Sequence, residues 1–328
     1  MIWRSIFRIL SPRGGAGRVS ILIFHRVLPV TDDLLPDVPD ARLFETRMRM
    51  LRDSCNVLHL SEALDRISAG SLPERAAVVT FDDGYADNHE VALPILRSLG
   101  VPATFFIASG FLDGGIMFND QVIEAMRNAS KSEIDAAWLG LGTLPIAGAE
   151  AKRAAIDRIL GAVKYLSFDE RRDAVVRLVD AAGAKLPDDL MMTRTMVRAM
   201  ELGGMQIGGH TRNHPILARM EPAAARAEIE GGKADLEQIL GHPIDLFAYP
   251  NGKPGRDYTR EHVIMAREAG YRSAVSTAFG SVGAGADLYQ LPRYTPWASS
   301  NWRYQAQFAA NLLRTPELAA ANASAAGH

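Results

Sequence analysis

Blocks of apolar residues with two different spacings follow one another along this chain. The clearest series begins with β-forming residues over 76–81, which end abruptly in two adjacent carboxylates, Asp82 and Asp83. Residues 88–100 then carry apolar side chains at helical spacing, and a second apolar run occupies 103–108. This order predicts a βαβ unit. Its carboxylates would lie at the C-terminal end of a strand, where open α/β sheets and α/β barrels place their chemistry.

The same spacings continue through the rest of the sequence. Strands are predicted over 20–25, 57–60, 205–209, 244–249 and 271–276, and helices over 41–52, 62–70, 221–240 and 258–269. Residues 119–200 differ, because apolar residues there recur almost wholly at three- and four-residue steps, apart from a break at 139–149. We interpret about 116–200 as a helical insertion on a βα scaffold. The alternation of strand and helix elsewhere predicts an α/β fold with a mainly parallel sheet or a barrel.

Three segments follow from this pattern: a basic N-terminal segment over 1–19, a main domain over 20–300, and a C-terminal helix and tail over 301–328. In the first segment Arg4 and Arg8 interrupt the apolar residues, so it lacks the apolar core of a signal peptide. Two interpretations of this segment stay open. We favour a short helix packed on the body, and the alternative is a helix lying in a membrane interface.

Composition narrows the functional classes. Apolar residues make up 48% and charged residues 23% of 328 residues, as in a globular protein with a large core. The net charge of −2 gives no field that would recruit nucleic acid. The single cysteine, Cys55, excludes an intramolecular disulfide and a thiolate-rich metal site. The sequence contains no run of about 18 apolar residues, so no membrane-spanning helix is expected. Because the signal-peptide pattern is also absent, we expect a cytoplasmic protein that could lie at the inner face of the membrane.

Two histidines add metal-binding chemistry to the carboxylate pair. His210 and His214 lie in GGHTRNHP, where a gap of four residues lets both imidazoles face one side of a turn. With Asp83 they form a set of two imidazoles and one carboxylate, which leaves open positions on a divalent ion and suits metal-assisted hydrolysis. The structural alternative is that Asp82 caps the next helix and Asp83 faces solvent.

These residues resemble the motifs of a known family, the polysaccharide deacetylases of carbohydrate esterase family 4, which carry the NodB homology domain. The resemblance spans about 20–294: TFDDGY at 80–85 matches the first motif, HTRNH at 210–214 the second, and FAYPNG at 247–252 is similar to the third. The FHRV stretch around His25 resembles a subset found with exopolysaccharide synthesis. The resemblance implies a deformed (β/α) barrel with a metal-dependent N-deacetylase site.

The resemblance also implies a role for individual residues. The implied metal ligands are Asp83, His210 and His214. Asp82 would be the base that deprotonates the attacking water, a backbone N–H near Asn251 would bind the oxyanion, and Tyr249 would contact the oxyanion or the substrate. Zinc suits the ligand types best, and cobalt or nickel would also fit. Asp120 would either line the sugar cleft or cap the helix that follows it, and we favour the cap.

Two positions depart from the family's pattern. Many members carry an arginine two residues before the proline of the third motif, where it holds the base, but this chain has Ala248. Many also have a late Leu-x-His whose histidine protonates the leaving amine, whereas this chain has Leu291-Pro292-Arg293, and an arginine cannot donate a proton at neutral pH. Arg293 is therefore expected only as a substrate contact. The leaving-group acid is either His25 or Asp82 after it has taken a proton from water; the structural alternative for His25 is a buried hydrogen-bonding residue.

The predicted function is removal of acetyl groups from N-acetylated amino sugars in a polysaccharide or a lipid-linked oligosaccharide precursor. One alternative is a hydrolase of the same fold that acts on a small non-sugar amide, which a closed pocket formed by the insertion would favour. Another is a carbohydrate-binding protein that has lost catalysis, which the missing arginine and histidine motivate. Contact with a membrane surface is an open expectation, and the sequence carries no signal for an oligomeric state.

Overall fold

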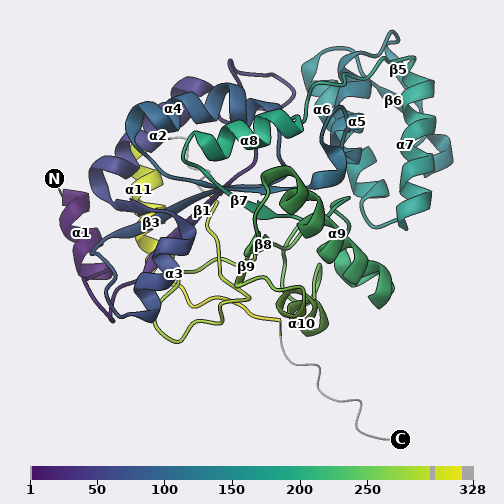
Figure 1. The fold of residues 1–328 in the computed structure, drawn as a ribbon. Coiled ribbons are helices and arrows are strands. Elements are labelled where there is room, and N and C mark those ends of the chain that lie inside the picture. The colour runs from purple at the N-terminus through teal and green to yellow at the C-terminus, as the bar shows by residue number, and fades with distance from the viewer. Residues whose placement is uncertain (1, 296–299, 320–328) are drawn as a thin grey trace, which may run out of the picture.

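The computed structural model describes residues 2–295 and 300–319. Its centre is a curled sheet in which every pairing is parallel (Figure 1). The strands are β1 (Val19–Phe24), β2 (Asn56–Leu58), β3 (Ala76–Phe81), β4 (Thr104–Ile107), β7 (Gln206–Gly209), β8 (Leu246–Ala248) and β9 (Ser273–Val275). Their order is β1-β3-β4-β7-β8-β9, and β2 also pairs with β3.

The segment after β9 links the two ends of this order. Leu291 forms a parallel bridge with Val275 of β9, and Tyr294 forms one with Leu22 of β1. The sheet therefore curls toward closure, which confirms the predicted α/β fold of the deformed-barrel type. The covering helices are α1 (Ile2–Leu10), α2 (Ala41–Ser54), α3 (Leu60–Ser68), α4 (Leu93–Leu99), α8 (Arg194–Leu202), α9 (Pro222–Leu240), α10 (Arg260–Glu268) and α11 (Asn301–Leu312).

Strand β3 shows why its sequence is almost wholly apolar. All six of its residues are buried, as expected for a parallel strand that is covered on both faces. Val78 lies in one apolar cluster with residues of the barrel interior, and Val79 lies in another that includes the inner faces of the helices. In the second cluster the Phe81 ring stacks on Phe105 with centroids 4.6 Å apart. Successive side chains thus bury into opposite layers.

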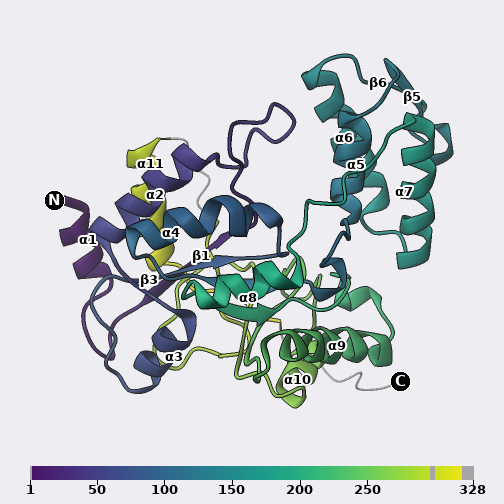
Figure 2. The ribbon, with the colours of Figure 1, turned by 45° about the horizontal axis from the view of Figure 1, so that its top comes forward.

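The insertion forms a separate body at one end of the molecule (Figures 1 and 2). It contains α5 (Phe118–Arg127), β5 (Glu133–Asp135), β6 (Thr143–Pro145), α6 (Ala149–Val163) and α7 (Phe168–Ala182). Its helices bury an apolar cluster of their own, which includes Val122, Ile159 and Leu178. The prediction of an almost wholly helical segment is wrong over β5, whereas β6 lies within the break predicted over 139–149. These two strands pair antiparallel, and Gly140 and Gly142 adopt positive φ in the connection between them.

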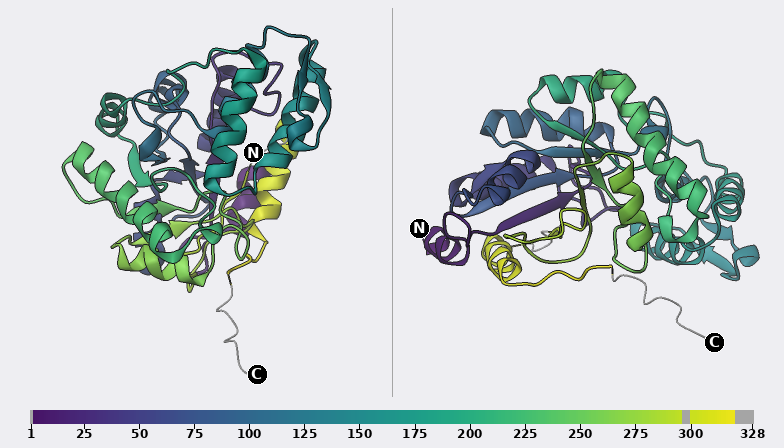
Figure 3. Two further views of the ribbon diagram at one scale, coloured as in Figure 1. Left: turned by 90° about the vertical axis from the view of Figure 1, so that its right-hand side faces the viewer. Right: turned by 60° about the horizontal axis from the view of Figure 1, so that its bottom comes forward.

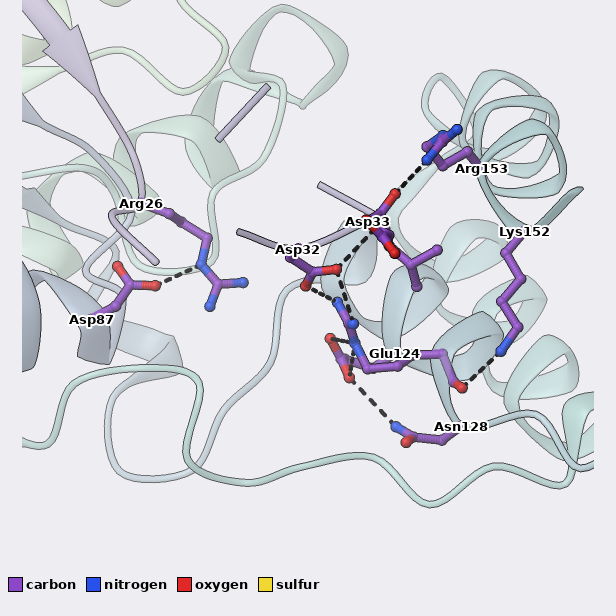
Figure 4. Close-up of polar contacts among 10 residues, drawn as sticks. Arg26, Asp32, Asp33, Asp87, Glu124, Asn128, Lys152 and Arg153 are labelled. Carbon is purple, nitrogen blue, oxygen red and sulfur yellow. Dashed lines mark hydrogen bonds and ion pairs between the residues drawn. The ribbon is translucent and has the colours of Figure 1, made fainter. Parts of the chain in front are cut away.

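Hydrogen bonds and ion pairs connect the loop after β1 to this insertion (Figure 4). Arg127 Nη2 of α5 lies 2.6 Å from Asp32 Oδ2, and Arg127 Nε lies 3.0 Å from Glu124 Oε1. Arg153 of α6 donates to the Asp33 carbonyl at 2.6 Å. Lys152 donates to the carbonyl of Arg127 at 2.9 Å, which ties α6 to α5. The same loop therefore fixes both helices relative to the barrel.

The N-terminal helix α1 packs on the body beside α11, at the end opposite the insertion (Figure 3). Phe7 is buried, and its ring centroid lies 4.8 Å from that of Phe308. This agrees with the favoured interpretation of a packed helix, although Ile2 and Ile9 remain exposed. Over the described residues, no helix combines the length and the apolar character needed to cross a membrane.

Candidate active site

The polar residues predicted at strand ends lie at one mouth of the barrel. His25 follows β1, Asp82 and Asp83 follow β3, His210 follows β7, and Asn251 lies just beyond β8. Because the strands are parallel, their C-terminal ends meet, and these residues border one cavity of about 250 Å³. His214 and Thr277 complete the barrel side, and the insertion supplies the opposite wall with Met117, Phe118, Asn119, Leu160 and Lys164.

Asp83, His210 and His214 converge on one point of this cavity. One potential ligand atom from each residue lies within 4.8 Å of the others. Asp83 Oδ1 is 3.5 Å from His210 Nε2 and 3.4 Å from His214 Nε2, which is too long for a good hydrogen bond. His210 Nδ1 lies 2.8 Å from the Ala248 carbonyl oxygen. This contact assigns the proton to Nδ1 and leaves the Nε2 lone pair facing Asp83, the usual arrangement of a metal-binding histidine.

The three side chains of this group are better suited to binding a cation than to pairing with one another. Asp83 Oδ1 is buried and accepts no hydrogen bond from the described part of the chain, and an unpaired buried carboxylate oxygen is costly. Burial, as the largest influence, lowers the pKa of His214 to about 4, so this imidazole is neutral at neutral pH and can act as a ligand. The donor set therefore fits a divalent ion with open positions.

The backbone around the cavity is strained. Six non-glycine residues have positive φ in the described part of the chain, and four of them border or support this site: Asp83 (78°), Thr211 (62°), His214 (51°) and Asn251 (57°). Such conformations are held only where the surrounding contacts enforce them. Here the Thr211 hydroxyl accepts from the His214 N–H at 3.1 Å and so holds the turn between the two histidines.

Asp82 is held by a buried arginine. Arg293 is fully enclosed, and its two terminal nitrogens donate to the two oxygens of Asp82 at 2.6 Å each. Arg293 Nε also donates to the Ser276 carbonyl at 2.9 Å. Burial, the largest single influence, would raise the pKa of Asp82, but the Arg293 guanidinium together with His210 and His25 outweighs it and holds this pKa below its ordinary value. Asp82 is therefore ionised at neutral pH.

This pairing corrects the expectation for Arg293. The side chain lies behind Asp82 and does not border the cavity, so it is not a substrate contact in this geometry. The pairing also connects the two departures from the family's pattern, Ala248 in place of an arginine and Arg293 in place of a histidine. Ala248 supplies no guanidinium to the base, and Arg293 supplies one from the segment after β9. A bidentate arginine gives the carboxylate a fixed orientation as well as a countercharge.

His25 and Asn251 lie where the sequence places them, at the cavity. His25 is exposed and its imidazole makes no hydrogen bond within the described residues, so the alternative of a buried hydrogen-bonding histidine is wrong. The Asn251 carbonyl accepts from the Thr277 hydroxyl at 2.7 Å. Its backbone N–H has no hydrogen-bond partner among the described residues. The His25 imidazole and the Asn251 N–H are thus available to a molecule in the cavity.

Tyr249 lies outside the cavity. Its side chain is fully buried, its ring stacks on Tyr258 with centroids 3.9 Å apart, and its hydroxyl donates to the Tyr289 carbonyl at 3.0 Å. The structure contradicts the predicted substrate contact because the alternation along β8 and its extension directs this side chain into the core.

Asp120 also lies away from both predicted positions. The helix α5 begins at Phe118, so Asp120 falls inside its first turn and does not cap it. Its carboxylate is buried and accepts from the Tyr85 hydroxyl at 2.9 Å. Burial raises the pKa of Asp120 to about 7. The residue links the loop after β3 to the insertion and does not border the cavity.

The insertion residues of the cavity wall were not predicted. Phe118 and Leu160 belong to helices, and Lys164 directly follows one. These helices show only amphipathic spacing in sequence, and this spacing does not indicate which residues meet the barrel mouth. Thr277 follows β9 and could have been expected from its place after a predicted strand.

Comparisons with known proteins agree with this site. The family model described as polysaccharide deacetylase matches residues 69–136 and 175–274, which include both carboxylates and both histidines. YxkH of Bacillus subtilis (strain 168), whose name assigns it to the polysaccharide deacetylases, is 20% identical over 278 residues, covering 84% of this chain and 70% of the relative.

Two solved structures share the fold. The deacetylase PplD of Streptococcus pyogenes, in complex with acetate, aligns with a TM-score of 0.59 at 19% identity and covers 88% of this chain and 97% of its own. A de-N-acetylase from Aggregatibacter actinomycetemcomitans aligns with a TM-score of 0.57 at 18% identity and covers 89% and 99%. At these identities the likeness shows the fold alone.

Proposed function

Because this chain belongs to the polysaccharide deacetylase family, we propose that it hydrolyses the acetamide of N-acetylated amino sugars in a polysaccharide or its lipid-linked precursor. One observation carries the proposal. An ionised carboxylate, Asp82, lies directly beside a set of two imidazoles and one carboxylate at the mouth of a barrel. Its Oδ2 is 3.8 Å from His210 Nε2, one of the proposed ligand atoms. A base next to a metal site is the arrangement that hydrolysis of an unactivated amide requires.

Asp83, His210 and His214 would hold the divalent ion. Zinc suits these ligands, with cobalt or nickel as alternatives, and when bound such an ion polarises a carbonyl and lowers the pKa of water. Asp82 takes the proton of the attacking water. Arg293 keeps this carboxylate ionised and fixes its direction.

Developing negative charge on the acetamide oxygen needs a donor that is already in place. The Asn251 backbone N–H has no partner among the described residues and belongs to a strained residue at the cavity, so it can donate without first breaking another hydrogen bond.

The leaving amine needs a proton, and Arg293 cannot provide it. His25 borders the cavity with an imidazole that makes no hydrogen bond within the described residues, so its side chain can reach a leaving amine in the cavity. The alternative donor is Asp82, which would return the proton it took from water. Replacing His25 by Gln separates the two: a large fall in kcat assigns the proton to His25, and an unchanged kcat assigns it to Asp82.

The insertion favours the small-amide alternative, because it forms one wall of a cavity of about 250 Å³. This volume holds one acetamido sugar more readily than a long polymer segment. The binding-protein alternative is weakened, because Arg293 supplies the guanidinium that Ala248 lacks. A pure binding site has no need of a carboxylate held ionised beside a ligand set.

The test is release of acetate from N-acetylglucosamine oligomers by purified protein, after chelation and after adding back zinc or cobalt. The same assay is run on Asp82→Asn, with Asp53→Asn as the matched control, since Asp53 is an exposed carboxylate away from the cavity. We expect metal-dependent release that Asp82→Asn reduces by about a hundredfold to ten-thousandfold and that the control leaves intact. Metal binding without release from any amino sugar would overturn the proposal.

A further inference from the structure

A group of three cations lies beside the active cavity, around one exposed aromatic ring. The ring is Tyr165, which directly follows Lys164 at the end of α6. Arg256 Cζ lies 4.9 Å and Arg219 Cζ 6.0 Å from its centroid, and Lys164 Nζ lies 5.8 Å from it. The Arg256 guanidinium also donates to the Tyr165 hydroxyl. We name Lys164, Arg219 and Arg256 the cationic rim.

The rim is continuous with the catalytic residues. Lys164 itself borders the cavity. Arg219 lies in the short helical turn that follows the His214 loop, and Arg256 lies in the loop that carries Asn251. The rim therefore joins the insertion to two catalytic loops of the barrel, and a molecule that reaches the cavity from this side must pass it.

The rim cations have no carboxylate partners. Within the described part of the chain none of the three forms an ion pair, whereas Arg212, next to the ligand turn, pairs with Asp235 at 2.7 Å. The carboxylates inside the cavity do not neutralise the rim either. Asp82 is already paired with the buried Arg293, and Asp83 faces the proposed ion. The mouth is thus positive on the insertion side, although the chain as a whole has a net charge of −2.

A neutral N-acetylglucosamine polymer offers these cations no counterpart, and its deacetylated product is itself cationic. Guanidinium groups bind carboxylates and phosphates through charge-assisted, paired hydrogen bonds, and an exposed tyrosine ring packs against a sugar face. Resting on the proposed function, we infer that the substrate carries an anionic group, a carboxylate or a phosphate, beside the N-acetylated sugar that is hydrolysed. The rim selects this substrate and repels the aminated product.

The test compares acetate release from three probes at low and moderate salt: neutral N-acetylglucosamine tetramers, tetrasaccharides that alternate glucuronic acid with N-acetylglucosamine, and N-acetylglucosamine 1-phosphate. The variant is Arg219→Gln with Arg256→Gln. The matched control is Arg303→Gln, an exposed arginine on α11 at the other end of the molecule.

We expect the wild-type kcat/KM for an anionic probe to exceed that for the neutral tetramer by about tenfold at low salt, through KM. The double variant should lose this preference and the control should keep it. The arm that shows the preference, uronate or phosphate, identifies the source of the anion. A wild-type enzyme that prefers the neutral tetramer, or a variant that lowers all three probes equally, would overturn the inference while leaving the deacetylase intact.

A binding measurement separates this inference from the proposed function. Calorimetric titration of the chelated protein with the uronate tetrasaccharide and the sugar phosphate needs no turnover. One outcome is that the double variant binds these probes about tenfold more weakly than wild type while no probe releases acetate. That result would support anion binding by the cationic rim and contradict the proposed deacetylase activity.

Discussion

The barrel mouth and the insertion face each other across one cavity, but they hold their side chains in different ways. On the barrel side Asp82 is buried and accepts two hydrogen bonds from Arg293, and the contact with the Ala248 carbonyl fixes the His210 ring. Four residues there are kept at positive φ. On the insertion side Leu160 lies in α6 and Lys164 directly after it; their side chains are half-buried and make no hydrogen bond or ion pair within the described residues.

The difference suggests a division of work. Groups that take part in bond making must be held to a fraction of an ångström, and buried ion pairs and strained turns achieve this. Groups that select a substrate tolerate small displacements, so half-buried side chains on the insertion suffice. If chemistry and selection separate along this boundary, changes on the barrel side should affect metal binding and kcat, and changes on the insertion wall should affect KM.

The largest effect is expected on the barrel side, from the proposed ligands. His210→Ala should remove an imidazole from the set and abolish both zinc binding and acetate release, because two remaining ligands hold the ion poorly. Zinc is measured by mass spectrometry of dialysed protein. His242→Ala is the matched control, since His242 is half-exposed and pairs with Glu201 on the surface. Full zinc content in His210→Ala would remove this residue from the ligand set.

The next largest effect is on stability. Arg293→Met leaves Asp82 buried without its countercharge, so the free energy of unfolding should fall by about 3–5 kcal/mol. Asp82→Leu combined with Arg293→Met removes both charges and should regain most of this loss, yet remain inactive. Urea unfolding followed by circular dichroism measures both. A single variant as stable as wild type would mean that the pair contributes little to holding the base.

Most of the barrel side could be predicted from the sequence because its chemistry is local. Asp82 and Asp83 end an apolar strand, and His210 and His214 lie four residues apart after another, so strand order alone brings them together. Arg293 was predicted at the site, but as a substrate contact and not as the partner of Asp82. Its contact with Asp82 spans 211 residues of sequence, and only the closure of the sheet brings the two together.

The insertion side could not be predicted in the same way. Amphipathic spacing gave three helices, but the same spacing fits any helix that buries one face. Which residue meets the cavity depends on the angle at which the insertion docks, and the contacts of Asp32 with Arg127 help to set that angle. The predictions for Tyr249 and Asp120 were wrong for a related reason. Tyr249 lies within the third motif and Asp120 in the first turn of α5, but both side chains are buried in the core.

A pH effect is expected where the two regions join. Burial raises the pKa of Asp120 to about 7, against about 3.9 in an unfolded chain. Between these values the folded state retains a proton that the unfolded state has lost, so stability falls by on the order of 4 kcal/mol as the pH rises from about 4 to about 7. Asp120→Asn should show a flatter dependence. Urea unfolding at pH 5 and pH 8 checks both, and parallel curves for the two proteins would place the titration elsewhere.

The smallest effect is expected on the insertion wall. Leu160→Ala removes half-buried apolar surface from the side opposite the proposed ligands, and about 1 kcal/mol of lost contact corresponds to roughly a fivefold rise in KM. The value of kcat should stay within about twofold, because the base and the ligands keep their positions. Leu202→Ala, at an exposed leucine on α8 outside the cavity, controls for the lost side chain. Steady-state kinetics on N-acetylglucosamine oligomers measure both constants. A fall in kcat that exceeds the rise in KM would show that the insertion positions the reacting groups, and the boundary between chemistry and selection would then lie inside the insertion.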